Sequence, residues 1–233
     1  YDLYGYVDRI PLKGVRKTIA SNMLKSFRET APVTSMIDVD VTHLWCVREN
    51  EKEIAEKQGV KLTFLPFIVK AVVSSLELHP YVNSSIENEE IILKKYYNIG
   101  IAVDTEVGLI VPVIKRAEQK DVMSIAKEIV DLSNKVKDRS IDIADLKGGT
   151  FTITNYGSIG GNYGCPIINY PECAILGIGR IEELPRVVDG KIVARKILPL
   201  SVTFDHRIVD GAEIARFMMD VKKRLEDPAL LLI

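Results

Sequence analysis

Apolar and polar positions follow a helical period in some stretches of the chain and a strand period in others. Apolar residues spaced four apart predict a first helix over 15–27. Strict alternation over 33–41 predicts a half-buried strand. Thr42 is suitably placed to cap the charged helix that follows, which we expect to end near Gln58.

A more apolar helix is predicted after Thr63, with Pro66 tolerated in its first turn and an end near His79. Apolar residues surround this segment instead of forming one stripe, so we expect it to lie at the centre of the fold. Runs of β-favouring residues then predict three strands. These strands occupy 89–96, 98–105 and 109–115.

Two amphipathic helices are predicted in the second half of the chain. Asp121 opens the first, and the second runs from about Gly211 to Glu226. The inward-facing residues of the last helix are Ile214, Phe217, Met218, Val221 and Leu225.

Three strand-like segments lie between those two helices. Residues 149–154 form a short strand, and 173–188 and 191–204 form two long ones. Asp189-Gly190 between the long strands is a strong signal for a two-residue hairpin. The glycine-rich stretch 155–164 is interpreted as a loop.

The alternation of helices and strands, with no linker-like tract, predicts a single α+β or α/β domain over 11–233 after a short lead over 1–10. With 47% hydrophobic residues among 233, the chain can form a substantial core. It carries 31 Lys and Arg against 32 Asp and Glu, so no positive excess is available to bind nucleic acid. No apolar run approaches the roughly 18 residues that a membrane span needs, which favours a soluble protein.

The first residues lack the basic start and apolar core of a signal peptide. They also lack an initiator Met, so we expect a piece of a longer protein whose linker is truncated within 1–10. Cys46, Cys165 and Cys173 show no CxxC spacing, which favours buried free thiols in a reducing compartment and hence a cytoplasmic protein.

Several familiar site patterns do not fit. The stretch 155–164 matches neither GxGxxG nor GxxxxGK, which disfavours nucleotide binding. Ser158 lacks the glycine two places earlier that a hydrolase nucleophile elbow requires. His43 and His79 have no carboxylate or cysteine at ligand spacing, so a structural or surface role is favoured over a metal site.

His206 is the third histidine, and it continues an apolar strand face that includes Val202 and Phe204. We expect such a position to desolvate the ring and keep it uncharged, so that it can accept a proton near neutral pH. Asp210, four residues later, is placed to cap the last helix. On these residues alone, a catalytic and a structural histidine fit equally well.

Five stretches are informative in combination: RKTIASNMLKS, GGTFTITNYGSIGG, NYPECAILGIGRI, FDHRIVDGAEIARF and DPALLLI. Together they resemble the catalytic domain of the dihydrolipoamide acyltransferases, the E2 cores of 2-oxo acid dehydrogenase complexes. The resemblance covers the chain from about Ile10 onward. The HxxxDG pattern alone also occurs in chloramphenicol acetyltransferase and related condensing enzymes, so the specificity comes from the combination.

The resemblance implies an α/β fold, a two-layer sandwich of a mixed sheet with helices like that of chloramphenicol acetyltransferase. It implies transfer of an acetyl or branched-chain acyl group between dihydrolipoamide and coenzyme A. His206 would take the proton from the coenzyme A thiol, because the thiolate is the nucleophile. Thr154, where the family usually has serine, would donate a hydrogen bond to the oxyanion, and Asp210 would maintain the site's architecture. Strand alternation places Thr154 on a polar face with Thr150 and Thr152, presented to its surroundings.

The resemblance also implies homotrimers that assemble into a hollow cage, with each active site between neighbouring subunits. The lipoyl group is expected on a separate domain absent from this chain, and the E1 and E3 components bind through modules also absent. We expect the apolar tail 228–233 to contact another trimer in preference to folding back. The alternatives are a small-molecule O-acetyltransferase of the chloramphenicol acetyltransferase type and a catalytically silent cage scaffold.

Overall fold

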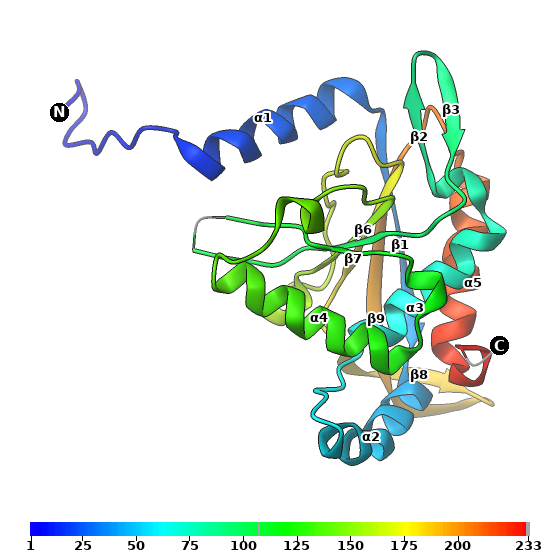
Figure 1. The fold of residues 1–233 in the computed structure, drawn as a ribbon. Helices are drawn as coiled ribbons and strands as arrows, with labels where there is room; N and C mark the ends of the chain where they lie inside the picture. Colours follow the sequence, from blue (N-terminus) through cyan, green and yellow to red (C-terminus); the bar gives the residue numbers. More distant parts are fainter. Residues whose placement is uncertain (107, 232–233) are drawn as a thin grey trace.

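A seven-stranded mixed sheet forms the centre of the structure, a computed structural model that describes residues 1–106 and 108–231. The strands of this sheet are β1 (Pro32–Asp40), β4 (Ile99–Ile101), β5 (Val113–Ile114), β6 (Phe151–Asn155), β7 (Ala174–Ile178), β8 (Glu182–Val188) and β9 (Lys191–Asp205). Strands β2 (Ser84–Glu87) and β3 (Glu90–Leu93) pair with each other in a separate antiparallel sheet. The α-helices are α1 (Gly14–Glu29), α2 (Thr42–Lys57), α3 (Leu65–Leu78), α4 (Val122–Lys137) and α5 (Gly211–Glu226). The predicted α/β sandwich of a mixed sheet with helices is confirmed (Figure 1).

The strand order of the main sheet is β1-β9-β7-β6-β4-β5, and β8 pairs with the first part of β9. Strand β6 runs parallel to β4 and β7, whereas β9 is antiparallel to β1 and β7. The predicted hairpin between β8 and β9 is confirmed. Asp189 and Gly190 have φ values of 50° and 75°, in the left-handed region that a type I′ turn requires.

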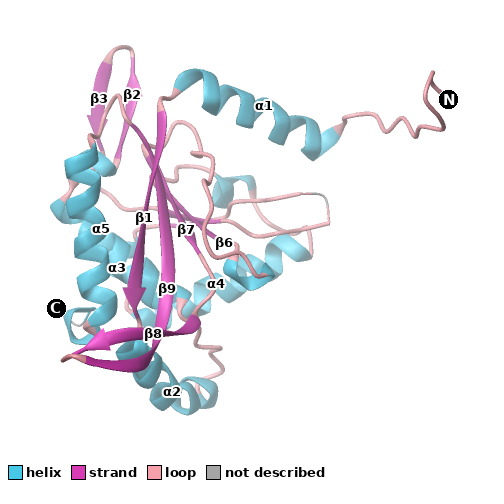
Figure 2. Ribbon diagram, turned by 180° about the vertical axis from the view of Figure 1, so that it is seen from behind, coloured by secondary structure: helices cyan, strands magenta, loops and turns pink. Residues whose placement is uncertain are grey.

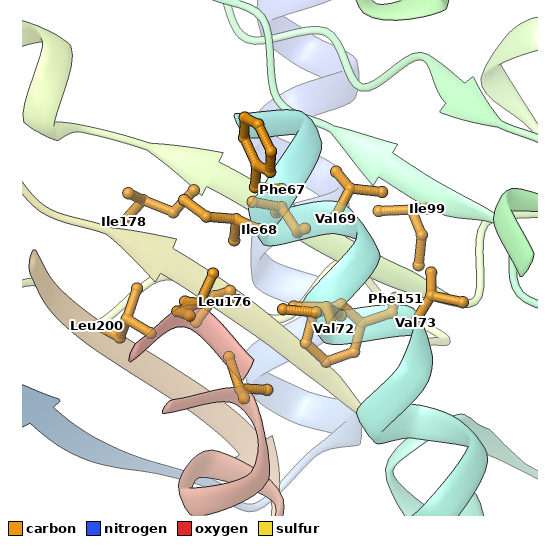
Figure 3. Packing of buried hydrophobic residues seen from close by; sticks show 14 of the residues in the cluster. Phe67, Ile68, Val69, Val72, Val73, Ile99, Phe151, Leu176, Ile178 and Leu200 are labelled. Carbon is orange, nitrogen blue, oxygen red and sulfur yellow. The ribbon is translucent and has the colours of Figure 1, made fainter. Parts of the chain in front are cut away.

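Helix α3 is the central helix that its all-round apolar sequence predicts. Figure 3 shows its side chains Ile68 and Val72 on the side of the helix that packs against strand residues such as Leu176 and Phe151. Most of the helix is buried, and each large apolar side chain removed from water contributes roughly 1.5–3 kcal/mol. This packing fixes the helical layer on one face of β4, β6 and β7.

Helix α5 begins and ends at the predicted residues, Gly211 and Glu226. The five residues predicted to face inward are all buried. Helices α3, α4 and α5 lie together on one face of the sheet (Figure 2). The start of α5 follows directly from the loop that leaves β9, so the packing of this helix positions that loop.

The opposite face of the sheet is covered by the loop between β6 and β7. Tyr156 in this loop donates its hydroxyl hydrogen bond to Ser201 Oγ at 2.9 Å, and Ser26 of α1 donates to the Ile168 carbonyl at 2.7 Å. Beyond that contact α1 extends away from the sheet (Figure 1), and Ser26 is its one buried residue. Phe27, on the predicted apolar face of this helix, is 58% exposed in the single chain.

Two local predictions are wrong. The segment 173–188 is two strands, because the chain leaves β7 at Gly179, where an added Cβ would lie 2.0 Å from the Asn162 carbonyl oxygen. Thr42 does not cap α2. It is the first helical residue, and its hydroxyl donates to Asp40 Oδ1 at 2.6 Å while accepting from the Lys196 amide at 2.8 Å.

Two further expectations need correction. Cys46 and Cys165 are exposed, so the prediction of buried thiols holds for Cys173 alone. In the C-terminal tail Pro228 is buried and Leu231 packs into this chain's own core, so the described part folds back. Residues 232–233 lie outside the described part, and contact of the tail with another trimer stays a prediction. Over 1–106 and 108–231 no helix combines the length and apolarity that crossing a membrane would need.

Candidate active site

His206 is the first residue after β9. Its amide donates to the Ala31 carbonyl at 2.9 Å, which ties the His206 backbone to the start of β1. The ring lies 5.6 Å from that of Phe204, between ring centroids, so it continues the apolar strand face as predicted. The side chain is exposed in the single chain, however, so the expected desolvation is not achieved by this chain alone. Strand alternation gives the direction of a side chain but not what lies beyond the strand end.

Asp205, immediately before His206, is a residue that the sequence analysis missed. It is 2% exposed and accepts hydrogen bonds from the amides of Ala31 and Arg207, both at 3.1 Å. The Arg207 guanidinium donates to both carboxylate oxygens, the shortest contact being 2.6 Å. Burial opposes the charge of Asp205, but these hydrogen bonds outweigh it and hold its pKa below the usual value. The sequence Asp205-His206-Arg207 places an acidic and a basic residue on either side of the histidine, and this was the signal that could have predicted their ion pair.

Asp210 is the N-cap of α5, as predicted. Its carboxylate accepts from the Glu213 amide at 2.8 Å, which satisfies one of the free amides of the first turn. The cap defines where the loop from His206 ends and where α5 begins. Asp210 therefore acts on the local architecture in this chain.

Thr154 is partly exposed near the end of β6, in line with its predicted presentation. Thr150 and Thr152 on the same face are buried, so the exposure is confined to Thr154 among the three threonines. The turn that precedes β7 covers Thr152, and Thr150 is hydrogen-bonded to the Asn98 backbone. Thr152 donates to Glu172 Oε2 at 2.6 Å, and Asn169 donates to Oε1 at 3.1 Å. Glu172 is 4% exposed, and burial raises its pKa to about 8.

His206 and Thr154 lie at opposite ends of the sheet within one chain. Thr154 is opposite Gly177, and Gly177 is opposite Ser201, five residues before His206 on β9. At about 3.3 Å per residue and about 4.8 Å per strand spacing, the two residues are separated by roughly 15–20 Å. One chain therefore does not bring this imidazole and this hydroxyl to the same reacting carbonyl.

Two cavities lie near these two ends of the sheet, although neither His206 nor Thr154 is among the residues that line them. A space of about 250 Å³ is lined by Thr30 and Pro32, which flank the Ala31 carbonyl that binds His206. A larger space of about 520 Å³ begins at Asn155, one residue beyond Thr154, and is lined also by Arg180 and by aromatic side chains of the helical layer. An apolar wall with a guanidinium is suited to a long organic substrate that carries phosphate.

The other two histidines lie elsewhere. His43 is exposed at the start of α2. His79 is buried at the end of α3, with Nδ1 at 2.8 Å from a Glu213 carboxylate oxygen and Nε2 at 2.8 Å from one of Asp220, so it ties α3 to α5. In the part of the chain that the structure describes, no cluster of His, Cys, Asp and Glu side chains has the arrangement of a metal site.

Comparisons with known proteins agree on one family. The model of the 2-oxoacid dehydrogenases acyltransferase catalytic domain matches residues 5–233. The dihydrolipoyllysine-residue acetyltransferase component of the pyruvate dehydrogenase complex of Bacillus subtilis is 49% identical over 228 residues, which cover 97% of this chain. Those residues are 51% of the Bacillus protein, so the chain spans about half the length of the curated relatives it matches.

Solved structures agree as well. The dihydrolipoamide acetyltransferase of Azotobacter vinelandii superposes with a TM-score of 0.95 at 39% identity, covering 99% of this chain and 96% of that one. The cubic core of a pyruvate dehydrogenase multienzyme complex gives a TM-score of 0.95 at 38% identity, with the same coverage. A chloramphenicol acetyltransferase, at 14% identity and a TM-score of 0.54 over 88% of this chain and 94% of that one, shares the fold, as predicted.

Proposed function

Because the chain belongs to the acyltransferase catalytic-domain family of the 2-oxoacid dehydrogenases, we propose that it transfers an acyl group between dihydrolipoamide and coenzyme A. The observation that carries this proposal is the placement of His206 and the Thr154 hydroxyl at opposite ends of the sheet. The chemistry of the family requires a histidine and a hydroxyl at the same thioester. Such an arrangement is complete only when a neighbouring copy supplies the other half.

In the proposed reaction, His206 accepts the proton of the coenzyme A thiol, and the resulting thiolate adds to the carbonyl carbon of the acyl thioester. Thr154 donates a hydrogen bond to the carbonyl oxygen as it gains negative charge. The bond from the carbonyl carbon to the lipoyl sulfur then breaks, and His206 returns the proton to that sulfur. Asp205 and Asp210 hold the His206 loop and do not touch the substrates.

The Azotobacter enzyme supports these assignments. The roles of a serine, a histidine and an asparagine have been investigated in its catalytic mechanism. That serine precedes that histidine by 52 residues, and the asparagine follows it by four. The same spacings separate Thr154, His206 and Asp210 in this chain. A threonine in place of serine keeps the hydroxyl and adds a methyl group.

For coenzyme A, we propose the cavity at the end of β6 that Asn155 and Arg180 line. Its aromatic and aliphatic wall suits the pantetheine arm. The Arg180 guanidinium, which is 54% exposed and forms an ion pair with Glu182, would contact a phosphate from its exposed side. The lipoyl group would then reach His206 from the opposite end, carried by a domain outside this chain. Partners of the wider complex, including the E1 and E3 components, would bind through such additional modules in the cytoplasm.

We propose a homotrimer that assembles further into a cage, as in the cubic core that the chain resembles. In the single chain, α1 carries exposed Leu24 and Phe27, each 58% exposed, and the preceding segment exposes Tyr4 and Ile10. Exposed large apolar side chains gathered in one segment are typical of a subunit interface. An interface at α1 would also bury the neighbouring His206 loop, because α1 leads directly into the Ala31 contact.

The test is an acyl-transfer assay between acetyl-coenzyme A and free dihydrolipoamide. We expect the parent protein to catalyse transfer, His206→Ala to lose it, and Thr154→Ala to slow it by about a hundredfold or more, the usual cost of one oxyanion donor. Thr154→Ser is the matched control and should remain active. Light scattering should show equal particle sizes for all four proteins. Equal rates for the parent and His206→Ala would reject the proposed mechanism, and preference for a hydroxyl acceptor would favour the O-acetyltransferase alternative.

A further inference from the structure

Tyr156 occupies a position beside Thr154 that no strand side chain fills. Gly177 on β7 is the direct neighbour of Thr154 in the sheet. A Cβ at Gly177 would lie 2.6 Å from Tyr156 Cε1 and 3.0 Å from its hydroxyl oxygen, so the ring rests directly on this glycine. The tyrosine ring, not a residue of β7, is therefore the lateral neighbour of the Thr154 side chain.

The ring is held there from several directions. Its hydroxyl donates to Ser201 Oγ at 2.9 Å, on the next strand along. Gly161 and Gly164 pack against the same ring, since added Cβ atoms would lie 2.9 Å and 3.2 Å from its carbons. The glycine-rich stretch 155–164, which matches no nucleotide-binding motif, thus packs around the Tyr156 ring.

We propose that Tyr156 limits the size of the acyl group that the Thr154 site accepts. The inference rests on the proposed function, in which Thr154 donates to the thioester carbonyl oxygen. The acyl chain is bonded to that same carbonyl carbon, and neighbouring side-chain positions across a sheet lie about 5 Å apart. The ring over Gly177 therefore bounds the space into which an acyl chain of more than two carbons would extend.

Tyr156→Ala removes the ring, and Tyr156→Phe is the matched control because it keeps the ring and removes only the hydrogen bond to Ser201. The measurement is kcat/KM for isobutyryl-coenzyme A divided by kcat/KM for acetyl-coenzyme A, with dihydrolipoamide as the acceptor. One or two methylenes in an apolar pocket change such a ratio by about 10- to 200-fold. We expect the ratio to rise at least about tenfold in Tyr156→Ala and to stay near the parental ratio in Tyr156→Phe.

A ratio that a folded, active Tyr156→Ala leaves unchanged overturns the inference, while transfer by the parent keeps the proposed function intact. No transfer by the parent overturns both. Tyr156→Leu tests the same space with a smaller side chain should the alanine variant fail to fold, and we expect an intermediate ratio for it. Loss of transfer by folded Tyr156→Ala and Tyr156→Leu alike would assign the ring a positioning role and overturn the limit on size.

Discussion

Replacing Glu172 by glutamine removes a buried carboxyl and should change how stability depends on pH. In the folded chain, burial raises the pKa of this carboxyl from 4.5 to about 8. Lys94 is the cation that acts on it, and the Thr152 and Asn169 hydrogen bonds favour the charge without outweighing burial. Between those two pH values the unfolded chain has lost a proton that the folded chain retains. The contribution of Glu172 to stability is therefore fully present below pH 4.5 and is lost as pH rises towards about 8.

The size of the effect follows from that interval. One proton contributes about 1.4 kcal/mol per pH unit, so the loss between pH 4.5 and about 8 is of the order of 5 kcal/mol. Glutamine keeps the shape and the hydrogen-bonding capacity but does not titrate. The stability of Glu172→Gln relative to the parent should therefore increase by about 1.4 kcal/mol per pH unit across most of this range.

Urea unfolding followed by circular dichroism, at one fixed protein concentration, measures this difference at about pH 5, 6, 7 and 8. Glu51→Gln, an exposed glutamate on α2, is the control and should show no such trend. A stability difference between Glu172→Gln and the parent that stays constant from about pH 5 to 8 would refute the claim that this carboxyl is uncharged in the fold.

Three further changes have defined outcomes. Asp210→Ala removes the cap on the Glu213 amide and should cost about 1 kcal/mol in chemical unfolding, and a variant as stable as the parent would contradict the cap. Phe217→Ala empties a fully buried site against Phe151 and should cost about 3–5 kcal/mol, whereas a loss below about 1 kcal/mol would contradict tight packing there. His206→Ala truncates a side chain that is exposed within its own chain and should change the unfolding of separated subunits by no more than about 0.5 kcal/mol, so that a larger loss would point to a structural histidine.

The elements that could be predicted are those with local signals. Helix α5 is bounded by its own cap, Asp210, and carries its own apolar stripe, and the β8–β9 hairpin is specified by Asp189-Gly190. The break at Gly179 depends on contact with Asn162, far along the chain, and no periodicity reports such a contact. Local patterns therefore predict the elements better than they predict where elements interrupt one another.

The candidate site was likewise predictable where the signal is local and not where it depends on distant parts of the chain. Asp210 and Thr154 have the cap and the exposure that their positions predict. The burial of Thr152 was missed because Glu172 covers it from another part of the chain. The exposure of His206 was missed because burial at a strand end depends on neighbouring surfaces, including those of other subunits.

The central claim is that His206 of one subunit and Thr154 of another act on the same thioester. Coexpressing His206→Ala with Thr154→Ala in equal amounts tests it most directly, because each variant supplies the residue that the other lacks. Each variant alone should be inactive or nearly so. Mixed assemblies should recover about one quarter of the parental activity. In random assembly, about a quarter of the interfaces place a subunit that retains His206 beside a neighbour that retains Thr154. Mixed assemblies no more active than the single variants would contradict a site shared between subunits.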